Sequence, residues 1–122
     1  DPNVHSNLGN VYSKKGLIDK AFEEYNAAIR LDRNYAQPHN NLGNIYFMEQ
    51  NLEEALKHYS EAAGIDPDYA AAQINLGNVY TVQKNYEQAV LSFQKALSIN
   101  DKDPNVHFNL ASLFYKQNNQ LF

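Results

Sequence analysis

The sequence predicts an all-α protein, an α-solenoid of antiparallel helix pairs, and two observations carry this prediction. The first is a repeat of 34 residues, since Asn-Leu-Gly-Asn occurs at 7–10, 41–44 and 75–78 and returns as Asn-Leu-Ala-Ser at 109–112. The second is the helical spacing of apolar residues on both sides of a polar break within each repeat. A unit this small cannot bury its apolar face alone, so stacked neighbours are expected to form the core.

Each repeat is predicted to contain two helices. In the second repeat the polar break is Gln50-Asn51, and the repeat closes on Asp66-Pro67-Asp68, a helix stop followed by a new start. Applied along the chain, this pattern predicts seven helices, near residues 3–15, 18–31, 36–49, 52–65, 70–83, 86–99 and 104–117, with 118–122 as a frayed tail.

Three glycines, Gly9, Gly43 and Gly77, occupy one repeated place inside the first helix of each pair. Glycine inside a helix costs roughly 1 kcal/mol relative to alanine, so its repetition suggests a steric requirement. We expect the two antiparallel helices to cross closely there.

The repeated residues resemble the tetratricopeptide repeat, whose pattern is Leu-Gly-x-x-Tyr, then Ala, an aromatic residue, Ala and Pro. In the second repeat these are Leu42, Gly43, Tyr46, Ala55, Tyr59, Ala62 and Pro67. The resemblance covers essentially the whole chain and implies a right-handed superhelix of about 3.5 repeats. Two places depart from the pattern: Arg33 and Asp101 replace the closing proline, and His5, His39, Gln73 and His107 stand where a large aromatic residue is common.

The repeat boundaries predict a single domain over residues 1–122, with repeats at about 2–35, 36–69 and 70–103 and a partial repeat at 104–122. Both ends of the chain fall within the pattern. We therefore expect the chain to be a fragment of a longer array.

Composition argues against several functional classes. The chain has no cysteine, no N-glycosylation sequon, no secretory leader and no apolar run of membrane-spanning length, which favours the cytoplasm or nucleus. A net charge of −4 argues against binding nucleic acid, which needs a basic face. Its four histidines show no metal-ligand spacing, and no catalytic or phosphate-binding motif occurs. We expect no enzymatic activity, cofactor, metal or membrane partner.

The resemblance implies that the first helix of each pair lines a concave groove, and asparagines recur on that surface. An amide offers two donors and an acceptor, so a row of amides can pair with the backbone of an extended peptide, similar to the asparagine ladder of O-linked N-acetylglucosamine transferases. The alternative is that these asparagines bond to neighbouring helices or water. The row comprises Asn7, Asn10, Asn41, Asn44, Asn75, Asn78 and Asn109.

Positions beside the asparagines differ between repeats, which is where specificity is expected. Exposed apolar residues often mark interaction sites, although some of these side chains can instead pack between adjacent helices. Lysines outnumber the single acid, Glu49, in the predicted first helices, which favours a neutral or acidic peptide. The candidate contacts at these positions are Asn40, Phe47, Met48, Ile74, Val82, Phe108, Lys14 and Lys116.

These observations predict a non-catalytic protein–protein interaction scaffold that binds an extended peptide or unstructured segment. One alternative is a structural module that self-associates through its exposed ends; another is a substrate-recruiting repeat region of a larger enzyme such as a glycosyltransferase. The clamp that holds chaperone C-termini in some tetratricopeptide proteins is not expected. Asn10 and Asn41 match its amide places, but Ser6, Ala71 and Asn75 stand at its basic places.

Overall fold

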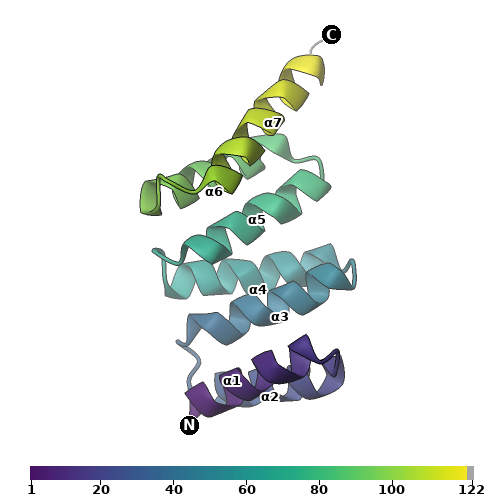
Figure 1. Ribbon diagram of the computed structural model, residues 1–122, viewed down its shortest axis with the longest axis vertical. Helices are drawn as coiled ribbons and strands as arrows, with labels where there is room; N and C mark the ends of the chain where they lie inside the picture. Colours follow the sequence, from purple (N-terminus) through teal and green to yellow (C-terminus); the bar gives the residue numbers. More distant parts are fainter. Residues whose placement is uncertain (121–122) are drawn as a thin grey trace. The chain divides into compact units, whose positions relative to one another are not determined.

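The computed structural model describes the backbone of residues 1–120 and the side chains of residues 1–118. The described residues form seven α-helices and no strand (Figure 1). The predicted all-α fold and its seven helices are confirmed, with every bound but the last within one residue of its predicted position. The helices are α1 (Pro2–Lys14), α2 (Ile18–Leu31), α3 (Ala36–Met48), α4 (Leu52–Ile65), α5 (Ala70–Val82), α6 (Tyr86–Ile99) and α7 (Pro104–Gln120).

The last helix, α7, is longer than predicted. The sequence predicts an end near residue 117 and a frayed tail from Asn118, but the helix continues to Gln120. Asn118 and Asn119 are weak stop signals, but no glycine or proline occurs in this segment to end the helix. Residues 121–122 of the predicted tail lie outside the described residues. None of the described helices is both long and apolar enough to span a membrane.

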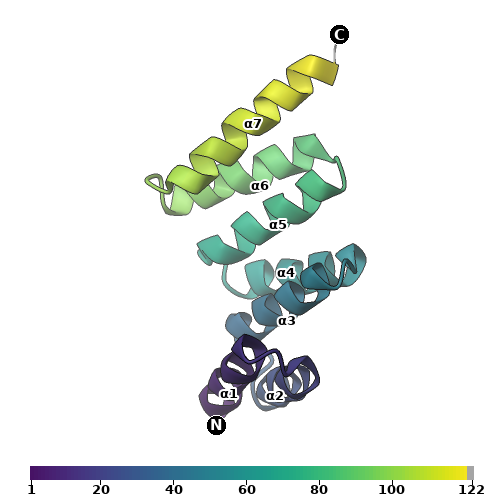
Figure 2. The same cartoon turned by 45° about the vertical axis from the view of Figure 1, so that its right-hand side comes forward.

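Where the sequence predicts one domain, contacts between residues divide the chain into two compact units, Asp1–Pro67 and Asp68–Phe122. Unit 1 contains the antiparallel pairs α1–α2 and α3–α4, with α2 also packed against α3. Unit 2 contains the pair α5–α6, and α7 packs against α6 (Figure 2). The two units are described separately below.

A left-handed residue ends the first helix of each pair. Gly16, Gln50 and Lys84 have φ of 77°, 62° and 61°. The following N–H then reaches back to the helix, as when Asn51 N donates to the Tyr46 carbonyl at 2.9 Å. This is the Schellman arrangement, which satisfies carbonyls at a helix C-terminus. The tight turn makes the next helix run antiparallel to the first in both units. Only the first copy has glycine, the residue that adopts a positive φ most readily, at this position.

Within each pair, an aromatic ring of the second helix packs directly on the repeated glycine. A Cβ atom on Gly9, Gly43 or Gly77 would lie 2.5–2.6 Å from a ring carbon of Tyr25, Tyr59 or Phe93, respectively. This is closer than carbon atoms can approach, so the predicted steric requirement is confirmed. The ring thus fixes the spacing between the two helices.

Each unit has its own apolar core around these rings. In unit 1, Ala21 and Tyr25 of α2 pack with Leu42 and Ile45 of α3. In unit 2, Phe93 lies in a cluster of α6 and α7 residues that also contains Ala89, Ala96, Val106, Leu110 and Leu113. The core therefore holds successive first helices at a fixed separation within each unit, which positions the surface described next.

Candidate functional site

The first helices of unit 1, α1 and α3, border a hollow of about 200 Å³, here called the unit 1 hollow. The asparagines of its lining are bonded within the protein. The Asn10 Oδ1 atom accepts a hydrogen bond from the Tyr25 hydroxyl at 2.6 Å and another from Asn41 Nδ2 at 2.9 Å. A carbonyl oxygen has two acceptor sites, so this oxygen is saturated. The hollow is lined by Asn10, Ser13, Lys14, Tyr25, Asn41 and Asn44.

The tyrosine–asparagine bond recurs in the second repeat, where the Tyr59 hydroxyl donates to Asn44 Oδ1 at 2.6 Å. Burial raises the pKa of both Tyr25 and Tyr59, because the charged phenolate would lose its hydration. The two phenols therefore remain protonated donors. For Asn10, Asn41 and Asn44, the structure agrees with the alternative interpretation that these asparagines bond to neighbouring helices.

The corresponding hollow of unit 2, here called the unit 2 hollow, has a volume of about 220 Å³ and a different chemistry. Phe93 stands in the place of the two tyrosines and has no hydroxyl to donate. Among the described residues, no side-chain hydrogen bond involves Asn78 or Asn109, the counterparts of Asn10 and Asn41. The hollow is lined by Asn78, Thr81, Phe93, Phe108, Asn109, Ser112, Leu113 and Lys116.

The unit 2 hollow has an apolar floor and a mixed rim. Phe93 and Leu113 are each only 1% exposed and form part of the core cluster. Phe108 at the rim is 72% exposed, the largest exposure among the large apolar side chains of the described residues. Lys116 is also exposed, and its Nζ lies 6.0 Å from the centroid of the Tyr86 ring.

The remaining predicted contact residues divide between surface and interior. Asn40 is only 4% exposed, which places it inside unit 1 and out of reach of a surface ligand. Ile74 is partly buried against the unit 2 core, as the packing alternative expects, and Phe47 is half-buried.

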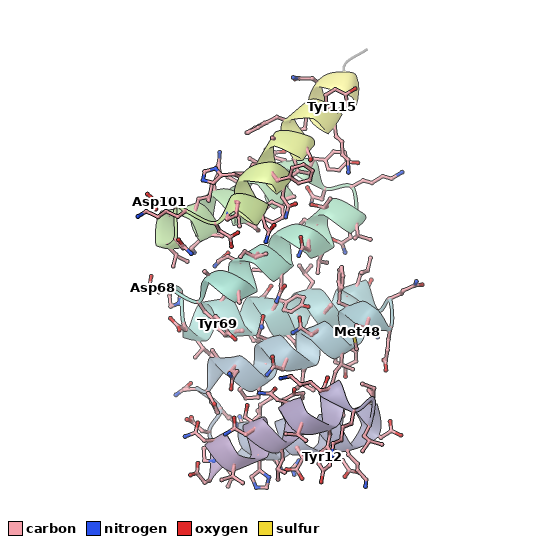
Figure 3. The ribbon with its side chains drawn as sticks, in the orientation of Figure 1. Tyr12, Met48, Asp68, Tyr69, Asp101 and Tyr115 are labelled. Atoms are coloured by element: carbon pink, nitrogen blue, oxygen red, sulfur yellow. The ribbon has the colours of Figure 1, made fainter. Side chains whose placement is uncertain are left out.

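The other predicted contact residues are more accessible. Met48, near the C-terminal end of α3 in Figure 3, is 63% exposed, and Val82 is 56% exposed. Asn7 and Lys14 are exposed, and Asn75 is half-buried with a partner of its own.

Charge separates between first and second helices more sharply than the sequence predicts. Helix α3 ends at Met48, so Glu49 falls in the turn and the first helices contain no carboxylate side chain. Their formally charged residues are Lys14 in α1 and Lys116 in α7. Apart from Asp1, which caps the N-terminus of α1, every acidic residue therefore lies in a second helix or a connecting segment.

Histidines that the sequence interpretation treated as separate come together in unit 1. The rings of His39 and His58 stack with centroids 6.2 Å apart, and the Tyr46 ring also stacks with His58, with centroids 5.3 Å apart. The same spacing of 19 residues joins His5 Nδ1 to Glu24 Oε2 at 2.6 Å in the first repeat. The spacing of 19 residues could have predicted both contacts from the sequence, because it brings two residues opposite each other on antiparallel helices joined by a short turn.

No group of three or more metal-ligating side chains gathers anywhere in the described part of the chain.

The stacked histidines predict that unit 1 loses stability as the pH falls. Burial lowers the pKa of His58, and the neighbouring His39 and Lys57 add to this, while Glu61 and Glu54 oppose it. Because the folded pKa is below the unfolded value of about 6.5, the native state binds fewer protons than the unfolded state. The stability that the neutral His58 side chain contributes to the folded state is therefore present in full above the unfolded pKa. It declines as the pH falls below that value.

Urea denaturation at about pH 7.5 and about pH 5.5, on either side of the ordinary histidine pKa, measures this loss. We expect His58→Gln to shrink the difference in unfolding free energy between the two pH values. Gln94→Ala, which changes an exposed side chain of unit 2 that does not titrate, serves as control and should leave the difference unchanged. An equal difference in the wild type and the His58→Gln variant would show that other groups cause the pH dependence.

Comparison with known proteins adds a family and a set of structural neighbours. A sequence model described as tetratricopeptide repeat matches residues 34–102, and one described as TPR repeat matches residues 9–50. No curated protein sequence matches the chain.

Three solved structures illustrate the structural likeness. The first TPR of Spaghetti (RPAP3), bound to the HSP90 peptide SRMEEVD, has a TM-score of 0.89 at 19% identity, covering 95% of this chain and 92% of that one. The N-terminal domain of stress-induced protein-1 from C. elegans has a TM-score of 0.80 at 26% identity, covering 92% and 93%. The Arabidopsis OM64 TPR domain has a TM-score of 0.84 at 21% identity, with the same coverage. These structures share the fold of helix pairs.

Proposed function

We propose, from the premise that this chain belongs to the tetratricopeptide repeat family, that its first helices bind an extended peptide or an unstructured segment of another protein. The family and the fold make the chain a protein-interaction repeat module. The binding face, the form of the ligand and the absence of catalysis by this chain are the proposed part.

The two hollows carry this proposal. They lie at equivalent places between successive first helices, and each combines asparagine amides with an exposed lysine. Exposed apolar side chains, including Met48 in unit 1 and Phe108 in unit 2, accompany them. Exposed apolar patches on a soluble protein often mark interaction sites. The first TPR of Spaghetti, which has the same fold, is bound to an HSP90 peptide, so this fold is able to hold a peptide.

Binding by variants of the two faces tests the proposal. A peptide is first selected for affinity to the chain from a random dodecapeptide library. Its affinity is then measured for Lys14→Glu with Met48→Ser in unit 1 and for Phe108→Ser with Lys116→Glu in unit 2. The matched control is Leu91→Ser with Lys95→Glu, an exposed apolar residue and an exposed lysine of α6.

We expect at least one first-helix variant to weaken binding by about tenfold or more, because each removes an apolar contact and reverses a charge. The α6 control should retain wild-type affinity. Failure to select any peptide, or a loss confined to the α6 control, would contradict binding on the first helices.

The peptide SRMEEVD, which the first TPR of Spaghetti binds, is expected to bind this chain no tighter than the high-micromolar range. The basic residues of a chaperone clamp are missing. In their places, Ser6 is fully buried with its hydroxyl donating to Gln37 Oε1 at 2.9 Å, and Ala71 has no charge. Calorimetric titration with SRMEEVD and with its C-terminal amide measures the affinity. A low-micromolar dissociation constant that is lost on amidation would show that a clamp for the terminal carboxylate exists after all, whereas binding through the Met-Glu pair would survive amidation.

A second candidate is self-association through α7, on which Phe114 and Tyr115 are 48% and 69% exposed. Each is a large aromatic side chain left uncovered on α7, and a second copy can cover exposed apolar surface of this kind. Analytical ultracentrifugation over a range of concentrations tests this candidate. Dimers that dissociate in a Phe114→Ser, Tyr115→Ser variant support it, whereas a monomer at every concentration rules it out.

A further inference from the structure

We propose that the unit 2 hollow is the anchoring site of this protein, and that it takes an extended peptide segment carrying a large apolar side chain next to an acidic one. This inference rests on the proposed function and adds to it a place and a ligand chemistry. In this inference Phe93 determines specificity, because its lack of a hydroxyl leaves the Asn78 side chain available to a ligand.

The availability of the amides follows from the comparison of the two hollows. In unit 1 the Tyr25 hydroxyl and Asn41 saturate the carbonyl oxygen of Asn10. In unit 2 the Phe93 ring packs on Gly77 as Tyr25 packs on Gly9, at 2.6 Å and 2.5 Å from the position of a Cβ atom, but it lacks the hydroxyl. The repeat architecture is thus preserved while two side-chain hydrogen bonds of unit 1 have no counterpart in unit 2: the phenol–amide bond, for which Phe93 has no hydroxyl, and the amide–amide bond.

The absence of both bonds leaves two amides without a protein partner on the lining of one hollow. Asn78 and Asn109 are both half-buried, and neither side chain has a hydrogen-bond partner within the described residues. Each amide offers two donors and one acceptor group. A peptide backbone presents both a donor and an acceptor at every residue, so an extended segment can satisfy these amides whatever its side chains are.

The floor and the size of the hollow specify the anchoring side chain. Phe93 and Leu113 form an apolar floor, and Phe108 adds an exposed aromatic wall. Thr81 contributes no free hydroxyl donor at the floor, because its Oγ1 donates to the Gly77 carbonyl at 2.7 Å. The volume of about 220 Å³ lies below the roughly 300–1,000 Å³ of typical small-molecule sites. One large apolar side chain such as leucine, methionine or phenylalanine fits this space better than a free metabolite.

The charge at the rim of the hollow indicates which residue of the peptide should lie next to its apolar anchor. Lys116 stands at the rim, and neither α5 nor α7 contains an aspartate or glutamate within the described residues. An acidic residue adjacent to the apolar anchor would meet a cation and no carboxylate from these two helices. Complementary charge mainly sets specificity and the rate of association, so a basic peptide is disfavoured.

Selection from a random dodecapeptide library tests the ligand chemistry. We expect the selected peptides to be enriched in a leucine, methionine or phenylalanine adjacent to aspartate or glutamate. Enrichment in lysine and arginine, or in polar residues with no apolar position, would overturn the proposal.

Variants of unit 2 test the place with a single selected peptide. Asn78→Ala and Asn109→Ala should each weaken binding about tenfold without changing the unfolding midpoint, because neither amide supports the fold. Gln94→Ala, an exposed amide on α6, is the matched control and should bind like the wild type.

Phe93→Tyr tests the specificity role directly. The added hydroxyl should bond to Asn78 as Tyr25 bonds to Asn10, and binding should weaken several-fold. In an Asn78→Ala background the same change should have little further effect, because its bonding partner is gone. Equal effects of Phe93→Tyr in both backgrounds would overturn this role. Circular dichroism verifies that each variant is folded.

The failure of this inference is distinguishable from the failure of the proposed function. If Asn10→Ala and Lys14→Glu abolish binding while Asn78→Ala and Asn109→Ala do not, the peptide binds on unit 1. The proposed function then stands and this inference is overturned. If no variant of the first helices changes the affinity, both are overturned.

Discussion

Replacing Tyr59 with alanine is expected to lower the free energy of unfolding by about 3–5 kcal/mol, the range seen when a large buried aromatic side chain is truncated. Tyr59 is 2% exposed, packs on Gly43, and donates its hydroxyl to Asn44. The change therefore opens a cavity between α3 and α4 and also removes a buried hydrogen bond. A small domain has only about 5–15 kcal/mol of stability, so this is a large fraction of the total.

Urea denaturation followed by circular dichroism measures the loss. Tyr115→Ala is the matched control, because the same truncation is made on a side chain that is 69% exposed. Its effect should stay within about 0.5 kcal/mol. If the two variants lose similar stability, the ring of Tyr59 does not hold the helix pair together.

Gly43→Ala is expected to destabilise the protein although alanine is the better helix former. The new methyl group would lie 2.6 Å from the ring of Tyr59, and that ring is buried and bonded at its hydroxyl. Overpacking of this kind costs about 1–3 kcal/mol, against a helix-propensity gain of about 1 kcal/mol. The net change should therefore be a loss.

The matched control for this glycine is Gly64→Ala in α4. Gly64 is exposed, and apart from its chain neighbours and the nearby backbone of its own helix, no atom lies within 4 Å of the position of a Cβ atom there. There the same substitution should raise stability by up to about 1 kcal/mol through propensity alone. Opposite signs for the two variants, measured by thermal denaturation, are the expected result. A gain at Gly43 would show that the ring moves aside at little cost.

The helices were predictable because their determinants are local and repeated. Helical periodicity, the turn residues after each first helix and the recurring glycine specify the helix pairs almost to the residue. The end of α7 was not predictable, because residues 117–120 contain no glycine or proline and their two asparagines are only a weak stop signal. Where the local signal for a helix end is weak, the predicted end of the helix is wrong.

The sequence predicts which residues share the surface of the candidate site, but only partly which hydrogen bonds their side chains make. Sequence spacing places Asn10 and Asn41 on the same face, but the bonds they make depend on the register between helices that are distant in sequence. The separation of 15 residues between Asn10 and Tyr25 is the signal that was missed, since it recurs between Asn44 and Tyr59. Once that spacing is recognised, phenylalanine at position 93 marks the repeat in which the amide stays unbonded.

The burial of Asn40 could not be predicted from the pattern. Its equivalents are Ser6, Ile74 and Phe108, whose exposure ranges from fully buried at Ser6 to 72% at Phe108. Equivalent positions in a repeat share backbone geometry, but each side chain's exposure depends on what the neighbouring helices place against it. A variable position in a repeat therefore identifies a candidate contact without showing that it reaches the surface.

The central claim is that the first helices bind a peptide, and side-chain amide signals test it most directly. Magnetic resonance spectra of the isotope-labelled chain, recorded while a selected dodecapeptide is added, follow the asparagine and glutamine side chains individually. Saturable shifts of the Asn78 and Asn109 amide signals, with the Gln94 signal on α6 unchanged, are the predicted result. Shifts confined to Gln94 and its neighbours on the second helices, with the first-helix amides unmoved, would contradict it.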